Sequence, residues 1–187
     1  MAEPKPYGRT TRWFHWGTAA LVAVMIPAGI LMTSEGFVGL RDALYIAHKG
    51  TGVLLLLVVF GRVGWMLLAR NRPEAAAGLP PRQQRLARTA HRTLYVLLVV
   101  MVVSGYTRTV GHGYPIELLD LLGIPPLIPE VPRIAAAASV IHKVTAYLLT
   151  AVIAVHVGAI AHQTMVVGDD TLARMWPGRH RREAPDA

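Results

Sequence analysis

The chain has 187 residues, of which 53% are hydrophobic and 16% are charged, so we expect one domain with a large apolar surface. It contains no cysteine, which excludes disulfides, iron–sulfur ligation and covalent haem attachment through cysteine. The net charge is +8, and the Lys and Arg residues that produce it cluster in particular links between apolar segments and at the chain ends. This distribution indicates membrane topology rather than nucleic-acid binding.

Four apolar segments, at residues 13–32, 44–68, 91–110 and 139–165, are each long enough to cross a bilayer. A spanning helix needs about 20 predominantly apolar residues. We therefore predict an all-α fold, a four-helix transmembrane bundle that forms one domain over residues 1–187. Basic residues precede the first segment as in a signal sequence, but no small-residue cleavage site closes it, so we expect this helix to be retained.

The distribution of Lys and Arg predicts the orientation of the bundle. Thirteen of these residues lie before the first segment, between the second segment and the start of the third, or after the fourth. The other two links carry one basic residue each, Arg41 and Arg133. Because cytoplasmic loops are enriched in Lys and Arg, both termini and the middle link are predicted to be cytoplasmic. The basic ends are expected to contact lipid headgroups, and no nucleic-acid partner is expected.

The link between the third and fourth segments is rich in proline and contains the stretch "IELLDLLG". We predict that this stretch is a short amphipathic turn at the outer interface, where it could cap a site from outside. The link between the second and third segments is predicted to be partly irregular and partly a surface helix.

Histidines recur within the apolar segments. His142 and His156 are fourteen residues apart in the fourth segment. In an α-helix this spacing places both on one face, within about 40° and about 21 Å apart. The inner, cytoplasmic half also contains His15 and His91, and the outer half contains His48, with His112 at the end of the third segment. Ionisable groups inside a membrane are functional candidates.

Two depths, each with histidines from different helices, suit two stacked b haems with two axial histidines each. The alternatives are histidines that only hydrogen-bond to neighbouring helices, and a proton relay, although no intramembrane carboxylate supports the relay. Zinc is a poorer interpretation because histidines spread over about 20 Å cannot converge on one tetrahedral centre. Small residues near these histidines could admit a flat macrocycle or simply allow close helix packing: Gly17, Gly50, Gly52 and Gly158.

Five motifs in this order resemble the prokaryotic cytochrome b561 family: "RWFHW", "IAHKGTG", "AHRTLYVLL", "IHKVTAYLLTAVIAVHVGAIAH" and "DDTLARMWP". The resemblance extends over nearly the whole chain, from Tyr7 to Pro177. It implies a multi-pass protein of the bacterial inner membrane with two b haems that exchanges electrons with quinone. Some members of the family oxidise superoxide outside the membrane and reduce ubiquinone.

Carried over onto this chain, the resemblance implies that His15 and His156 are the axial ligands of the inner haem. His48 and His142 would then bind the outer haem, and His91 would not be a ligand. The chain departs from the family pattern at Gly168, where many members have a basic residue, and at Gln163, where a histidine or other polar group is common. These departures concern the region expected to contact quinone.

Arg62 follows His48 by the same fourteen residues that separate the two histidines of the fourth segment. We therefore predict that Arg62 lies at the depth of the inner haem, where its guanidinium binds a haem propionate or instead extends to the headgroups. His162 lies about 240° around the helix from His156, so it is interpreted either as a surface histidine or as a hydrogen-bond partner of a quinone.

Lys49 and Lys143 each follow an outer ligand, and Arg108 lies near the outer end of the third segment. These cations are predicted either to neutralise haem propionates and lipid phosphates or to attract a small anion such as superoxide.

The predicted function is one-electron transfer between the outer side and the quinone pool, either as a superoxide:ubiquinone oxidoreductase or as an electron carrier. One alternative is the cytochrome b anchor subunit of a larger dehydrogenase or hydrogenase complex. An alternative of another class is a haem-free transport or structural bundle.

Overall fold

The computed structural model describes residues 7–68, 80–169 and 171–176. The long helices are α1 (Arg9–Leu31), α2 (Arg41–Leu68), α3 (Pro81–Gly111) and α5 (Pro132–His162). The shorter elements are η1 (Glu35–Leu40), α4 (Glu117–Leu121), η2 (Gln163–Val167) and α6 (Thr171–Met175). The described chain is all-helical, and its four long helices are long and apolar enough to cross a membrane, as a four-helix transmembrane bundle requires.

The helices extend beyond the apolar segments that predicted them. α3 begins at Pro81, ahead of the predicted start at residue 91, because the intervening polar stretch is rich in Arg, Gln, Leu and Ala, which favour helix. Pro81 and Pro132 open α3 and α5, where a missing N–H costs no hydrogen bond. The regular α-helix of the fourth segment ends at His162, before a π-helical turn over residues 163–167.

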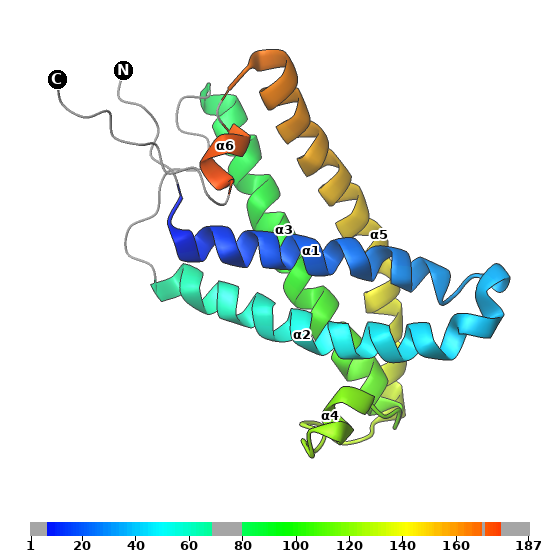
Figure 1. Ribbon diagram of the computed structural model, residues 1–187. Coiled ribbons are helices and arrows are strands. Elements are labelled where there is room, and N and C mark those ends of the chain that lie inside the picture. The colour runs from blue at the N-terminus through cyan, green and yellow to red at the C-terminus, as the bar shows by residue number, and fades with distance from the viewer. Residues whose placement is uncertain (1–6, 69–79, 170, 177–187) are drawn as a thin grey trace.

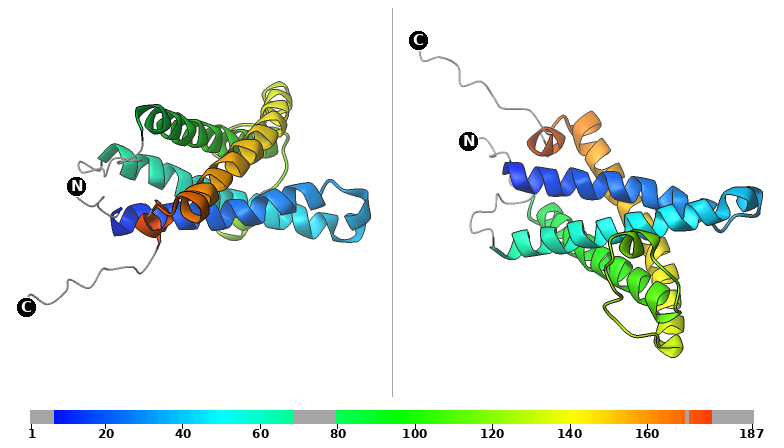
Figure 2. Two further views of the ribbon diagram at one scale, coloured as in Figure 1. Left: turned by 90° about the horizontal axis from the view of Figure 1, so that it is seen from above. Right: turned by 60° about the horizontal axis from the view of Figure 1, so that its bottom comes forward.

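The long helices form two pairs. η1 joins α1 and α2, which run side by side in opposite directions (Figure 1), while α3 packs along α5 and also contacts α2. The α3/α5 pair lies obliquely across the α1/α2 pair (Figure 2). We call the end that holds the start of α1 and the last turn of α5 the inner end, and the end that holds η1 and α4 the outer end.

The core lies between the two levels of histidines. Val22 and Leu149 are each seven residues from a candidate ligand on their own helix, which corresponds to about 10 Å along the helix. The buried cluster that fills this middle layer consists of Val22, Leu55, Val59, Leu98, Val102 and Leu149. Large apolar side chains on the outside remain exposed, for example Leu57 at 62% and Leu148 at 52%, which suits contact with lipid tails.

Candidate functional site

The outer half of the bundle brings two histidines face to face. His48 of α2 and His142 of α5 have ring centroids 6.5 Å apart and an interplanar angle of 85°. An imidazole nitrogen binds a metal at about 2 Å, so two rings on opposite sides of one metal have centroids roughly 6 Å apart. The observed separation therefore suits one metal bound between the two rings.

The ring of His142 is held by α3. Its Nδ1 lies 3.1 Å from the carbonyl oxygen of Met101 and 3.3 Å from Oγ of Ser104. Because a carbonyl only accepts hydrogen bonds, Nδ1 carries the proton and Nε2 keeps its lone pair for a metal. The sequence analysis did not identify Met101 or Ser104, since a backbone contact between two helices leaves no mark in a motif.

Two glycines pack against these rings. A Cβ on Gly29 would lie 3.4 Å from Cε1 of His48, and a Cβ on Gly105 would lie 3.0 Å from Cε1 of His142. Both glycines were missed, although each follows an inner histidine by fourteen residues and therefore shares its face. Of the predicted glycines, Gly50 faces Leu118, Gly52 faces Met25, and Gly17 and Gly158 border open space.

Three histidines gather at the inner level. The rings of His91 and His156 have centroids 5.3 Å apart and an interplanar angle of 75°. His15 of α1 lies close enough to both for their charges to interact with it. The structure thus brings together all three inner histidines that the sequence singled out.

Arg62 lies beside this inner cluster. Its Nε donates a hydrogen bond of 3.0 Å to the hydroxyl of Tyr95, and its guanidinium lies 4.8 Å from the centre of the Tyr95 ring. Its charge acts on His15, His91 and His156. Within the described ranges, no carboxylate forms an ion pair with Arg62.

The outer link closes over α2 beside His48. Nζ of Lys49 lies 2.6 Å from Oε1 of Glu117 in α4 and donates to the carbonyl oxygen of Pro115 at 2.7 Å. Desolvation raises the pKa of Glu117, but its bonds to Lys49 and to backbone N–H outweigh this effect, so the pKa lies below the ordinary value of 4.5. The short helix α4 confirms that the stretch predicted as a turn in this link is helical.

The remaining predicted residues lie apart from the histidine pairs. Lys143 is exposed on α5, and His162 is exposed at its inner end. His112 is exposed at the outer end of α3, with its ring 5.9 Å from that of Tyr114. Arg108, in contrast, lies close enough to both outer histidines for its charge to act on them.

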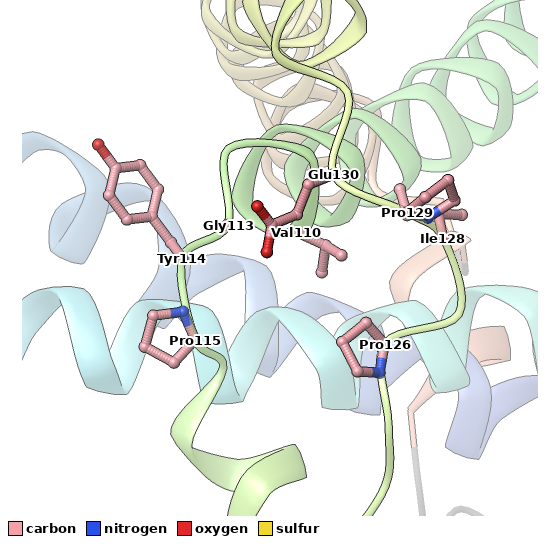
Figure 3. A pocket seen from close by; sticks show the side chains of 8 residues that line it. All are labelled: Val110, Gly113, Tyr114, Pro115, Pro126, Ile128, Pro129 and Glu130. Atoms are coloured by element: carbon pink, nitrogen blue, oxygen red, sulfur yellow. The ribbon is translucent and has the colours of Figure 1, made fainter.

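A pocket of about 380 Å³ opens at the outer end, between the end of α3 and the proline-rich link (Figure 3). The carboxylate of Glu130 points into the space near Val110 and Gly113. The lining residues are Val110, Gly113, Tyr114, Pro115, Pro126, Ile128, Pro129 and Glu130. None of the histidines contributes to this pocket, so it is separate from the outer pair.

The donor set fits haem better than a single metal ion. Among the described residues, no group of three or more His, Asp or Glu side chains is arranged to bind a metal ion. Haem supplies its own equatorial nitrogens and needs only axial ligands, which opposed histidines provide. Nδ1 of His15 and of His48 is buried without a hydrogen-bond partner among the described residues, so each ring retains an unsatisfied polar atom at its level.

Comparison with known proteins agrees with this arrangement. The sequence profile of the family described as prokaryotic cytochrome b561 matches residues 6–178. The chain is also 27% identical to cytochrome b561 homolog 2 of Escherichia coli (strain K12) over 173 residues, which is 92% of each chain. These matches confirm the resemblance seen in the histidine motifs. The chain therefore belongs to the prokaryotic cytochrome b561 family of membrane proteins, which implies binding of haem b and electron transfer.

Proposed function

We propose that this protein is a di-haem b cytochrome that carries single electrons between its outer side and the quinone pool. The observation that carries this proposal is that α5 places one histidine at each of two levels, and each of these lies against histidines of other helices. His142 faces His48 at the outer level, and His156 lies beside His15 and His91 at the inner level. When bound, haem iron supplies reversible one-electron redox chemistry.

The chain's own residues set the positions of the two sites. We assign His48 and His142 as the residues that would hold the outer haem, and His15 and His156 as those that would hold the inner one, with His91 beside them. The carbonyl of Met101 orients His142. Fourteen residues of helix place the two levels about 21 Å apart, and the apolar layer between them excludes water from the path.

We further propose that ubiquinone exchanges electrons at the inner end, with both termini in the cytoplasm of a bacterial cell. Exposed His162 at the inner end of α5 is the proposed hydrogen-bond partner of a quinone head group. The excess of basic residues at this end supports the orientation.

At the outer end, we propose that superoxide is the electron donor and that cations attract it. Arg108 acts on both outer histidines, and Lys143 is exposed one residue after His142. The ion pair with Glu117 offsets the charge of Lys49. Lys49 therefore attracts an anion less strongly than Lys143 does, although each directly follows an outer histidine in the sequence.

Spectroscopy of the purified full-length chain tests the proposed function. A reduced-minus-oxidised spectrum and a haem assay should show two low-spin b haems per chain, and added ubiquinone should reoxidise the reduced protein. A chain that folds in detergent without haem would support the transport or structural alternative. Stable copurification with a soluble dehydrogenase would identify the anchor alternative.

Stopped-flow kinetics tests the donor. Electrostatic attraction raises association rates by about 10- to 1000-fold and fades with salt, as the Debye length falls from about 10 Å at 0.1 M to about 3 Å at 1 M. Haem reduction by superoxide should therefore slow with ionic strength. The double variant Arg108→Gln/Lys143→Gln should flatten this dependence more than Lys49→Gln does. A rate independent of both salt and substitution would contradict steering of an anion.

A further inference from the structure

The C-terminal helix α6 is attached to the start of α1 at the inner end. Nη1 of Arg12 donates to the carbonyl oxygen of Trp176 at 3.0 Å, and the indole N–H of Trp16 donates to that of Met175 at 2.8 Å. The rings of Trp16 and Trp176 also meet edge to face, with centroids 5.3 Å apart. Arg12 and Trp16 stand one turn apart on α1, so they present one face to α6, and His15 lies between them in sequence.

Arg12 is buried although it carries a full charge. Only 7% of its surface is exposed, and its Nε is buried without a hydrogen-bond partner. A guanidinium has five donors and stays protonated, so burying it beside a single backbone carbonyl leaves much of its hydrogen-bonding capacity unused. Among the described residues, no carboxylate forms an ion pair with it. A buried cation in this state is a candidate binding partner for an anion.

The position of Arg12 indicates which anion this is. His15 follows it by three residues, so the two side chains are neighbours on the helix surface, about 60° and 4.5 Å apart. The inner site beside them contains further imidazoles and the cation of Arg62, and no acid in the described part of the chain pairs with Arg62 either. A ligand that brings its own carboxylates would satisfy both cations, and haem b carries two propionates.

We propose that Arg12 is a carboxylate-binding residue of the inner haem site, holding one haem propionate with the donors that α6 leaves free. This inference rests on the proposed function, in which the inner site binds haem. The Nε of Arg62 already donates to Tyr95, so of these two inner guanidinium groups it is that of Arg12 whose Nε remains available. The same side chain then links the cofactor to α6 through Trp176.

Redox titration of the full-length haem protein tests this assignment. A cation beside a propionate favours the reduced haem, so Arg12→Leu should lower the midpoint potential of the inner haem and leave the outer one unchanged. We expect about a tenfold change in the reduction equilibrium, which is 59 mV for one electron. Arg9→Leu is the matched control, because it removes the same charge one turn earlier on α1 from an exposed position. Arg12→Lys should keep most of the wild-type potential.

The failure of this inference can be distinguished from failure of the proposed function. If the wild type lacks an inner haem, the proposed function is wrong. If the wild type has both haems and Arg12→Leu retains them with unchanged potentials, or if Arg9→Leu shifts the inner haem equally, only the assignment of Arg12 is wrong. If Arg12→Leu loses the haem, Arg12→Lys decides: retention supports a charge contact, whereas loss shows that Arg12 serves only to hold α6.

Haem whose propionates are esterified distinguishes the source of the anion. Arg12→Leu should weaken binding of haem b to the full-length chain but leave binding of the dimethyl ester unchanged. Equal weakening of both would overturn the assignment in favour of a lipid phosphate or a structural role. Trp16→Phe removes the hydrogen bond from the indole to Met175, which loosens α6 but keeps the charge of Arg12. The midpoint potential of the inner haem in this variant should match that of the Arg9→Leu control.

Discussion

Neighbouring residues of α3 fix the orientation and the tautomer of the His142 ring, which leaves its Nε2 available to bind a metal. The carbonyl of Met101 fixes the tautomer, Ser104 adds a second contact, and Gly105 leaves room for the ring. Partners of this kind usually affect metal affinity by 10- to 100-fold, although they do not touch the metal. The outer site therefore depends on α3 as well as on the two helices that supply its ligands.

Substitution of single histidines tests the pairing. His48→Ala and His142→Ala should each remove the same haem, and His15→Ala and His156→Ala should each remove the other, because axial ligands act as pairs. His91→Ala should retain both. Haem content per chain and the potentials of the remaining haem measure this outcome. If His91→Ala lost a haem while His15→Ala kept both, the inner assignment would be wrong.

Gly105→Ala tests the close contact with His142. The added Cβ would lie 3.0 Å from Cε1 and 3.2 Å from Nδ1, so the ring must move and the outer haem content should fall. Gly64→Ala is the control, because its Cβ would meet nothing within 4 Å. Both changes gain up to about 1 kcal/mol of helix propensity, so a loss specific to Gly105→Ala reports the clash. Equal haem content in the two variants would contradict the role of Gly105.

At the scale of elements, α4 is a cap on the outer end of α2. Leu118 of α4 packs against Gly50 of α2, where an added Cβ would lie 3.6 Å from that of Leu118. Lys49 forms an ion pair with Glu117 and donates a hydrogen bond to the carbonyl oxygen of Pro115. The side chains of Lys49 and Glu117 are 16% and 38% exposed, so the ion pair is partly open to solvent. Ion pairs near the surface contribute only about 0.2–1 kcal/mol, so we expect this cap to open without unfolding the bundle.

Lys49→Gln should therefore loosen α4 and speed reduction of the outer haem by a small membrane-impermeant reductant. Acid should act in the same direction. The pKa of Glu117 is lowered below 4.5, so the contact is fully present above pH 4.5 and is lost as the pH falls through the lowered pKa. Lys143→Gln is the control for charge alone, since Lys143 is exposed. A rate that responds equally to the two substitutions would contradict a cap held by Lys49.

At the scale of the whole molecule, the natural absence of cysteine allows a direct test of orientation. Leu121 is 83% exposed in α4, and Leu86 is 72% exposed near the start of α3. Leu121→Cys should react with an impermeant maleimide in cells with a permeable outer membrane, while Leu86→Cys should react only after lysis. The reverse pattern would invert the bundle and place the cap on the cytoplasmic side.

The number of long helices and the two levels of histidines followed from the sequence alone. Apolar length determines whether a helix can span the bilayer, and a spacing of fourteen residues determines which side chains share a face, so both are local properties. The ends of the helices were predicted less well. Polar residues such as those at the start of α3 continue a helix beyond the membrane without any apolar signal.

The contacts between distant residues were decided by the tertiary structure. Lys49 is separated from Glu117 by 68 residues, and Arg12 is separated from Trp176 by 164. Lys49 was predicted either to neutralise haem propionates and lipid phosphates or to attract a small anion, but folding of the outer link supplies a carboxylate partner, Glu117. Arg12 appeared as one of several topology-setting charges, and the fold places it in a buried position where it donates to the carbonyl oxygen of Trp176. The sequence determines the type and charge of each residue, whereas its burial and its interaction partners depend on which helices pack together.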